Sequence, residues 1–166
     1  MSYFFPGRED TAMNEMQPGA RQLAFHAVIV LALGMVSGFI WGNIMADPAA
    51  TLTRAAAWRL AHIEGFANGV LMLVIALSYP LVQPNAKAER LIRYGMIVVG
   101  YSNILASMYG GLLDARGTMP NAQSSVHDLV VFFGFMPGVI AIFIVLGAMA
   151  SSLRANEGCL YYATNL

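Results

Sequence analysis

Three polar residues, His62, Glu64 and Asn68, stand at the start of an apolar stretch, "RLAHIEGFANGVLMLVIALSYPL", which begins at Arg59. A polar side chain inside a bilayer is costly, about 2.5–3.5 kcal/mol when it is charged, so such residues are candidates for function. Histidine can bind a metal ion, and asparagine can orient a bound oxygen atom or ring. We expect Glu64, near the end of the stretch, to be solvated. The alternative role for His62 is a hydrogen bond to a neighbouring helix or to water.

Two glycines share a helical face with His62. Gly65 and Gly69 follow it by three and seven residues, and residues at these spacings lie on one side of a helix. As a GxxxG pair they favour the close packing of two membrane helices. They also leave a flat strip on which a macrocycle could lie, with the imidazole of His62 as the axial ligand of a haem iron. Asn68 lies about 240° further round the helix, so it and His62 cannot both face one point from the same side.

A second set of polar and small residues lies in "GYSNILASMYGG". Asn103 and Ser107, four residues apart, share one face of a helix, while Ser102, Ala106 and Gly110 share another. Small residues at this spacing usually indicate helix packing, and an asparagine in a membrane helix can form an interhelical hydrogen bond. The sequence contains no Walker loop, CxxC, HExxH or GxSxG motif, which disfavours ATPase and hydrolase activities.

The elements that must position these residues are membrane helices. The chain of 166 residues is 58% hydrophobic and 11% charged, whereas soluble domains contain about 25% charged residues. About 20 apolar residues cross the hydrocarbon as a helix, and only helices satisfy their own backbone there. We therefore predict an all-α integral membrane protein, a four-helix transmembrane bundle over residues 23–153 between a polar N-terminal tail (1–22) and a C-terminal tail (154–166). The expected spans are residues 23–44, 61–82, 91–113 and 129–153.

Loop charges indicate the orientation. Nine Lys and Arg balance nine Asp and Glu, so the net charge gives no indication of a nucleic-acid partner. Six basic residues fall in the two tails and the second loop, against three in the other loops, which places both termini in the cytoplasm by the positive-inside rule. His26 then lies near the cytoplasmic face and His62 near the opposite face. We expect most of the membrane to separate them, so that they cannot bind one metal ion. His62, Asn68, Asn103 and Ser107 would share the outer half.

The segment "AHIEGFANG" resembles the styrene oxide isomerase family, which consists of small bacterial membrane proteins with four spans. In that family a histidine at the start of the second span binds haem b, and an asparagine six residues later faces the substrate. His62 and Asn68 keep this spacing. The similarity continues through "YPLVQPNAKAERLIRYGMIVVGYSN", and "RQLAFH" and "FMPGVIAIFIVLGAM" match the first and fourth spans. It covers most of residues 21–151.

The resemblance implies a multi-pass protein of the bacterial inner membrane. It would be a homotrimer that binds haem b between its subunits and takes a hydrophobic substrate from the bilayer. The implied reaction is the Meinwald rearrangement of an aryl epoxide to an aldehyde: Lewis-acidic iron draws on the epoxide oxygen, the benzylic C–O bond opens and a hydride migrates. The implied residues are His62 as iron ligand, Gly65 and Gly69 against the haem, and Asn68, Asn103 and Ser107 in catalysis.

One position departs from the family's pattern. The family has a catalytic tyrosine four residues after the asparagine that matches Asn103, and this chain has Ser107 there. The nearest tyrosine, Tyr109, lies about 200° round the helix. Two alternatives to an isomerase therefore stay open. One is a non-catalytic haem-binding or electron-transfer subunit, and the other is a haem-free structural subunit of a larger membrane complex.

Overall fold

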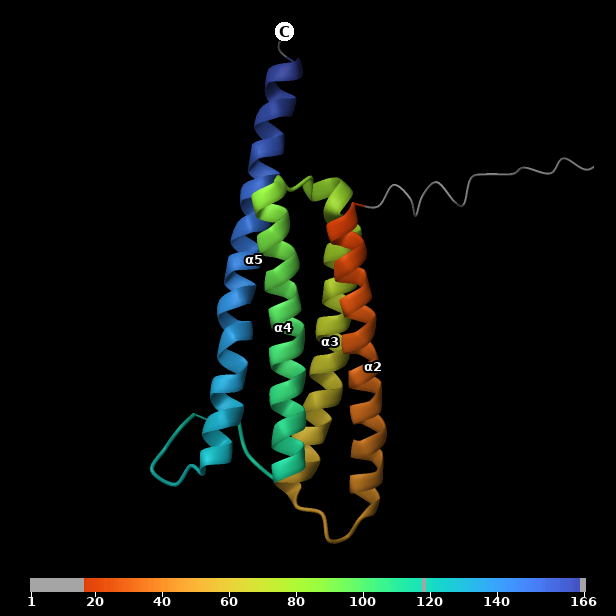
Figure 1. Cartoon of the computed structure of the whole chain (residues 1–166), viewed down its shortest axis with the longest axis vertical. Coiled ribbons are helices and arrows are strands. Elements are labelled where there is room, and N and C mark those ends of the chain that lie inside the picture. The colour runs from red at the N-terminus through yellow and green to blue at the C-terminus, as the bar shows by residue number, and fades with distance from the viewer. Residues whose placement is uncertain (1–16, 118, 165–166) are drawn as a thin grey trace, which may run out of the picture.

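The protein is described by a computed structural model over residues 17–117 and 119–164, with side chains as far as Ala155. Four α-helices account for most of these residues, and no strand occurs among them. Each helix is long and apolar enough to cross a membrane. The all-α, four-helix membrane class is therefore confirmed. The helices are α2 (Pro18–Ala46), α3 (Leu52–Val82), α4 (Ala86–Leu113) and α5 (Val126–Thr164), shown in Figure 1.

The expected spans lie inside these helices, but three of the helices begin well before the apolar run. Polar caps explain the difference for α3 and α4, whereas α2 begins at Pro18 without a side-chain cap. The Thr51 hydroxyl accepts a hydrogen bond from the Arg54 backbone N–H at 3.0 Å and starts α3. The side-chain oxygen of Asn85 accepts hydrogen bonds from two backbone N–H groups and starts α4 in the same way. Because capping needs polar side chains, helix starts lie in the interfacial layer, where hydropathy does not reveal them. The predicted ends at Val82 and Leu113 match the helix ends.

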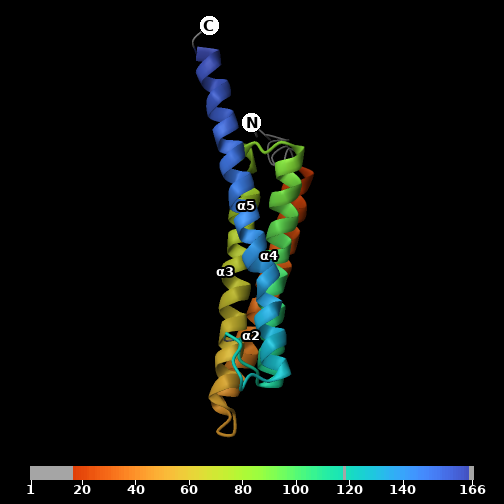
Figure 2. The same cartoon turned by 90° about the vertical axis from the view of Figure 1, so that its left-hand side faces the viewer.

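The helices form an incomplete bundle in which α3 and α4 are central. α2 packs against both of them, and α5 packs against α4 but hardly touches α3. Within the described part of the chain, α2 and α5 make no contact. Figure 1 shows α3 and α4 between them, and in Figure 2 α5 faces the viewer. We call the end where α2 and α4 begin the inner end, and the end where they finish the outer end.

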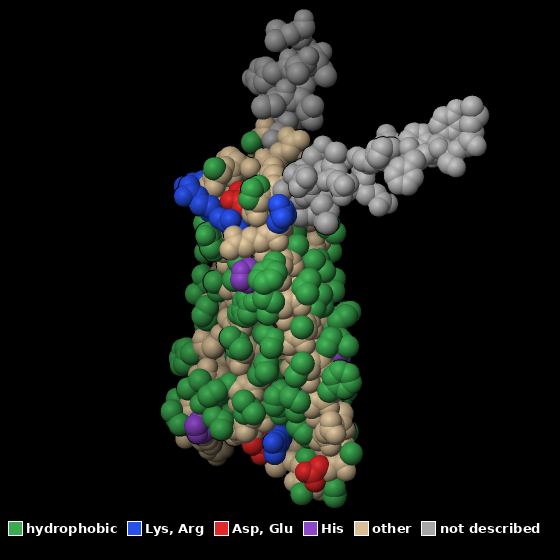
Figure 3. All heavy atoms as spheres, turned by 45° about the vertical axis from the view of Figure 1, so that its right-hand side comes forward, with side chains coloured by type: hydrophobic (Ala, Val, Ile, Leu, Met, Phe, Trp, Pro, Cys, Tyr) green, Lys and Arg blue, Asp and Glu red, His purple; other side chains and the backbone are tan. Residues whose placement is uncertain are grey.

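The apolar core lies in the inner half. It contains buried side chains from all four helices, among them Leu23, Met72, Tyr79, Ile92 and Val145. Elsewhere the bundle carries large apolar side chains on its outside, where Figure 3 shows hydrophobic groups over the middle of the molecule and charged groups near its ends. A surface of this kind is stable against lipid hydrocarbon rather than water.

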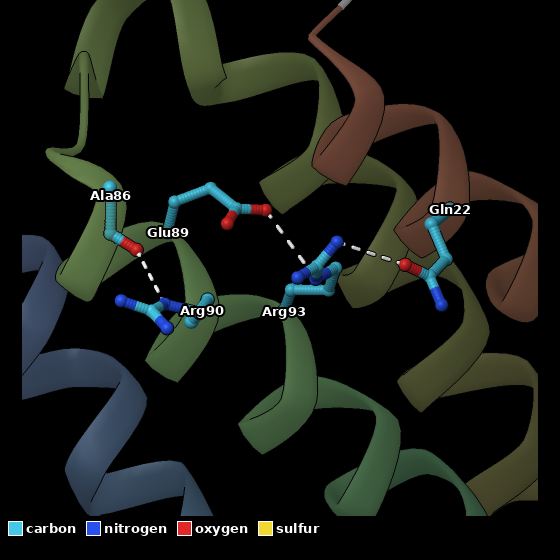
Figure 4. Close-up of polar contacts among 5 residues, drawn as sticks. All are labelled: Gln22, Ala86, Glu89, Arg90 and Arg93. Carbon is cyan, nitrogen blue, oxygen red and sulfur yellow. Dashed lines mark hydrogen bonds and ion pairs between the residues drawn. The ribbon is translucent and has the colours of Figure 1, made fainter.

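A polar link joins α4 to α2 at the inner end. The Arg93 guanidinium donates to the Gln22 side-chain oxygen at 2.9 Å and lies 3.4 Å from the Glu89 carboxylate (Figure 4). The Glu89 carboxylate also lies against Gly19, so a larger residue at this position would require the Glu89 side chain to move. This link fixes the register of α2 on α4 at the end opposite to the candidate site.

Candidate functional site

His62 is held by α2. Its Nδ1 lies 2.9 Å from the carbonyl oxygen of Gly34, and its ring stacks on Trp41 with the centroids 6.3 Å apart. A Cβ at Gly38 would lie 2.7 Å from Nδ1, so only glycine leaves room for the imidazole. A carbonyl oxygen only accepts, hence Nδ1 carries the proton. Nε2 has no hydrogen-bond partner among the described residues.

This arrangement is the one that an iron-binding histidine needs. Such a histidine usually donates its other ring N–H to a carbonyl or carboxylate, which fixes its tautomer and orientation. His62 does so through Nδ1, and its unprotonated Nε2 can donate a lone pair to iron. The side chain is also partly exposed. The geometry of His62 therefore fits a haem ligand. The hydrogen bond to a neighbouring helix, which was the alternative role, is also present, and the two roles are compatible because they use different ring nitrogens.

The two glycines that follow His62 are packed against α2. Gly65 meets the backbone of Gly34 so closely that neither could carry a side chain: a Cβ at Gly34 would lie 2.8 Å from the carbonyl carbon of Gly65. A Cβ at Gly69 would lie 2.5 Å from Cγ of Leu31. The packing interpretation of the GxxxG pair is thus what the structure shows, since α2 fills the expected flat strip. The role of both glycines against haem stays a prediction.

Glu64 is the centre of a polar cluster that the sequence analysis missed. Its Oε2 accepts a hydrogen bond from Asn68 at 2.7 Å and a weaker one from Asn103 of α4 at 3.3 Å. Glu64 is partly exposed, but the expectation of a solvated side chain did not include these two partners, because it considered only depth in the membrane and not the face of the helix. A Glu–Asn pair four residues apart was the available signal. An ionised carboxylate only accepts, so it turns both amide nitrogens toward itself and both amide oxygens away.

Ser107 lines a cavity of about 360 Å³ at the outer end. Its side chain is 1% exposed, and its hydroxyl has no hydrogen-bond partner in the described part of the chain. Leaving a buried hydroxyl unpaired costs about 1–3 kcal/mol, which a bound polar group would recover. A volume of this size is typical of sites for small ligands. The other lining residues are mostly small or apolar: Leu52, Thr53, Ala56, Ala57, Leu60, Gly110, Ala115, Arg116, Gly117 and Val131.

The cavity and the polar cluster follow one another along the α3–α4 groove. Leu60 precedes Glu64 by four residues, and Ser107 follows Asn103 by four, so each pair is one helical turn apart, about 6 Å. Asn68, Asn103 and Ser107 are therefore brought to one side of α3. His62 is not, since it faces α2. The six-residue spacing between His62 and Asn68 predicted that the two side chains would lie on different sides of the helix.

The remaining histidines and Tyr109 lie outside the cluster. Nδ1 of His26 lies 3.1 Å from the Tyr101 hydroxyl, and the Tyr109 hydroxyl lies 2.9 Å from Nδ1 of His127. His62 contacts α2 between Gly34 and Trp41, which follow His26 by eight to fifteen residues, or about 12–22 Å of helix. The two histidines therefore lie far apart along the bundle and do not share a site. Among the described residues no cluster of His, Cys, Asp or Glu could hold a metal ion alone.

Comparison with known proteins adds two findings. A family model described as styrene oxide isomerase matches residues 19–154. The hydroxylaminobenzene mutase HabB of Ectopseudomonas oleovorans is 32% identical over 111 residues, which cover 66% of this chain. The chain spans 62% of that protein's length.

Proposed function

The chain belongs to the styrene oxide isomerase family, and from this premise we propose that it is a haem b-dependent membrane isomerase that converts small aryl epoxides to aldehydes. The observation that supports the proposal is the hydrogen bond between His62 and the Gly34 carbonyl, because it orients the ring and keeps the lone pair of Nε2 available, as an iron ligand requires. Haem b, when bound, would supply a Lewis-acidic iron that draws electron density from the epoxide oxygen.

The chain's own residues supply the rest of the site. The apolar cavity beside Ser107 takes the aryl group and excludes water. Opening of the benzylic C–O bond creates positive charge on carbon, and the Glu64 carboxylate, one turn away, stabilises that charge in a medium of low dielectric constant. Asn68 and Asn103 hold the carboxylate in place and direct their amide oxygens away from it. The reaction is an isomerisation, so no second substrate is required.

The positions of these residues favour a closed homo-oligomer, which we propose is a trimer with haem between subunits. His62 faces α2, and Glu64 and its partners face α4 from the other side of α3. One ligand can meet both sets only if two copies of the chain contribute them. We place this assembly in the bacterial inner membrane with both termini in the cytoplasm.

A second candidate is the rearrangement of an aryl hydroxylamine. The relative's name favours it, since hydroxylaminobenzene mutase acts on such a compound. Ser107 favours it as well, because its unpaired hydroxyl could meet a more polar substrate than an epoxide. Both reactions move a group within one small aromatic molecule.

The test is to purify the protein in detergent, record its oxidised and reduced optical spectra, and assay it with styrene oxide and with phenylhydroxylamine. A Soret band with conversion of styrene oxide to phenylacetaldehyde is the expected result. Conversion of phenylhydroxylamine alone would move the assignment to the mutase. Haem without either activity would favour a non-catalytic haem-binding or electron-transfer subunit, and absence of haem from the wild type would overturn the proposal.

A further inference from the structure

A groove of about 430 Å³ lies between α4 and α5 at the inner end, away from the candidate site. It is lined by Lys87, Arg90, Leu91, Tyr94, Gly95, Val98, Ala141 and Ile144. Gly95 and Ala141 form its floor, where the Val145 side chain packs against Gly95. Leu91, Val98 and Ile144 are 40–47% exposed along it. The groove is therefore an open apolar channel on the lipid-facing surface.

Positive charge is confined to one end of this groove. Lys87 and Arg90 lie in the first two turns of α4, and both are exposed. Arg90 uses its Nε to donate to the Ala86 carbonyl at 3.1 Å and extends away from the contact between Arg93 and Gln22 (Figure 4). Glu89 is paired with Arg93 instead. Among the described residues, neither cation at the groove has a carboxylate partner.

The length of the groove matches one leaflet. Lys87 and Val98 are eleven residues apart on α4, which corresponds to about 16 Å of helix. The hydrocarbon core is about 30 Å thick, so one leaflet contributes about 15 Å. A groove that starts at two cations in the interface and runs to the middle of the bilayer has the dimensions of a lipid with its headgroup at the cations.

We infer that this groove binds one anionic glycerophospholipid. Its phosphate meets Lys87 and Arg90, and one acyl chain lies along Leu91, Gly95 and Val98. Basic pockets between membrane helices bind anionic headgroups in this way. Asn85 already caps the first N–H groups of α4, so the side chains and not the helix amides hold the phosphate.

The polar hollow at the outer end has a different character from this groove. The polar hollow there is lined by Asp114 and Asp128 as well as Arg116, so it carries charges of both signs. Arg116 is also engaged, since its Nε donates to the Thr53 hydroxyl at 3.1 Å. This polar hollow is therefore a poorer match for an anionic lipid than the groove at the inner end.

The test is native mass spectrometry of the purified full-length protein with an equimolar mixture of phosphatidylglycerol and phosphatidylcholine. We expect wild-type protein to retain phosphatidylglycerol preferentially. Lys87→Gln/Arg90→Gln should reduce that preference by about 30-fold, equivalent to about 1 kcal/mol for each cation. Val98→Trp, which fills the apolar part, should also weaken retention, and Lys87→Arg should preserve it.

The matched control is Arg54→Gln/Arg59→Gln, which removes two exposed cations from the opposite end and should leave the preference unchanged. An equal loss in the control would mean a general effect of net charge and would overturn the inference. Retention that survives Val98→Trp would also overturn it, because surface charge alone would then suffice. A variant that loses its helical circular dichroism is replaced by the single substitution Arg90→Gln, for which a partial loss is expected.

Discussion

Nδ1 of His62 lies 2.9 Å from the carbonyl oxygen of Gly34, so α3 supplies the imidazole and α2 fixes its orientation. The bond joins two helices through a backbone acceptor that no side-chain substitution removes. Trp41 restrains the same ring from its face. An imidazole held on two sides before any ligand arrives loses little further freedom on binding, which favours affinity.

We expect His62→Ala to remove most of the Soret absorbance of the purified protein and His26→Ala to retain it. His26 is bonded to the Tyr101 hydroxyl on the inner side of the site and has no part in the arrangement around Gly34. The measurement is haem content per protein by pyridine haemochrome. Equal loss in the two variants would contradict the assignment of the ligand.

Asn68→Ala should leave haem content unchanged and lower the conversion of styrene oxide at least about tenfold. That corresponds to about 1.4 kcal/mol, the loss of one hydrogen bond to a charged group. The reason is that Asn68 donates to Glu64 on the side of α3 away from His62. A fall in haem content parallel to the fall in activity would show instead that Asn68 supports the fold.

Glu64→Gln should lower turnover more than Asn68→Ala does, because it removes the charge itself as well as the acceptor for two amides. The substitution keeps the shape of the side chain, so haem content serves as the control for folding. Since the two residues act as one unit, the double variant should lose less than the product of the single losses. If the double variant instead lost turnover by the full product of the two single losses, the proposal that Glu64 and Asn68 act as one unit would be contradicted.

Ser107→Tyr should fold and raise activity on styrene oxide, because the cavity beside Ser107 has room for a phenol. The control is Ser102→Tyr, which has no such space: a Cβ at Gly138 of α5 would lie only 2.5 Å from the Ser102 hydroxyl. We expect a large drop in melting temperature for the control alone. Unchanged activity in a stable Ser107→Tyr protein would mean that the cavity serves a different substrate.

Gly65→Ala should destabilise the protein by about 1–3 kcal/mol, since the new methyl group meets the backbone of Gly34 and neither helix can yield locally. Gly42→Ala is the matched control. No atom lies within 4 Å of a Cβ at Gly42, and alanine is the better helix former by about 0.5–1 kcal/mol. Thermal unfolding in detergent should therefore show a lower melting temperature for Gly65→Ala and a slightly higher one for Gly42→Ala.

Hydropathy was sufficient to predict the four helices, because lipid imposes a length and a composition that few other structures share. It could not predict their starts, which depend on capping by Thr51 and Asn85 outside the apolar runs. Helix starts are thus the part of the fold that a membrane sequence reveals least.

The site was predicted only where spacing along one helix was enough. The separation of His62 from Asn68 follows from 100° per residue, and the structure keeps them on different sides of α3. The contact of Glu64 with Asn103 depends on the register of α3 against α4, which no local pattern specifies. The cavity at Ser107 depends further on the loop at Ala115 and on α5, so it is a property of the assembled helices alone.

The restriction of α5 to contacts with α4 has a consequence for biosynthesis. α2, α3 and α4 all contact one another, and these contacts do not depend on α5. A nascent chain that has emerged only to Leu113 can therefore already assemble its first three helices in the bilayer. The last helix then docks on a finished surface. Each helix after α2 packs against the helix immediately before it in the chain, so insertion by the translocon and packing can proceed in the same order.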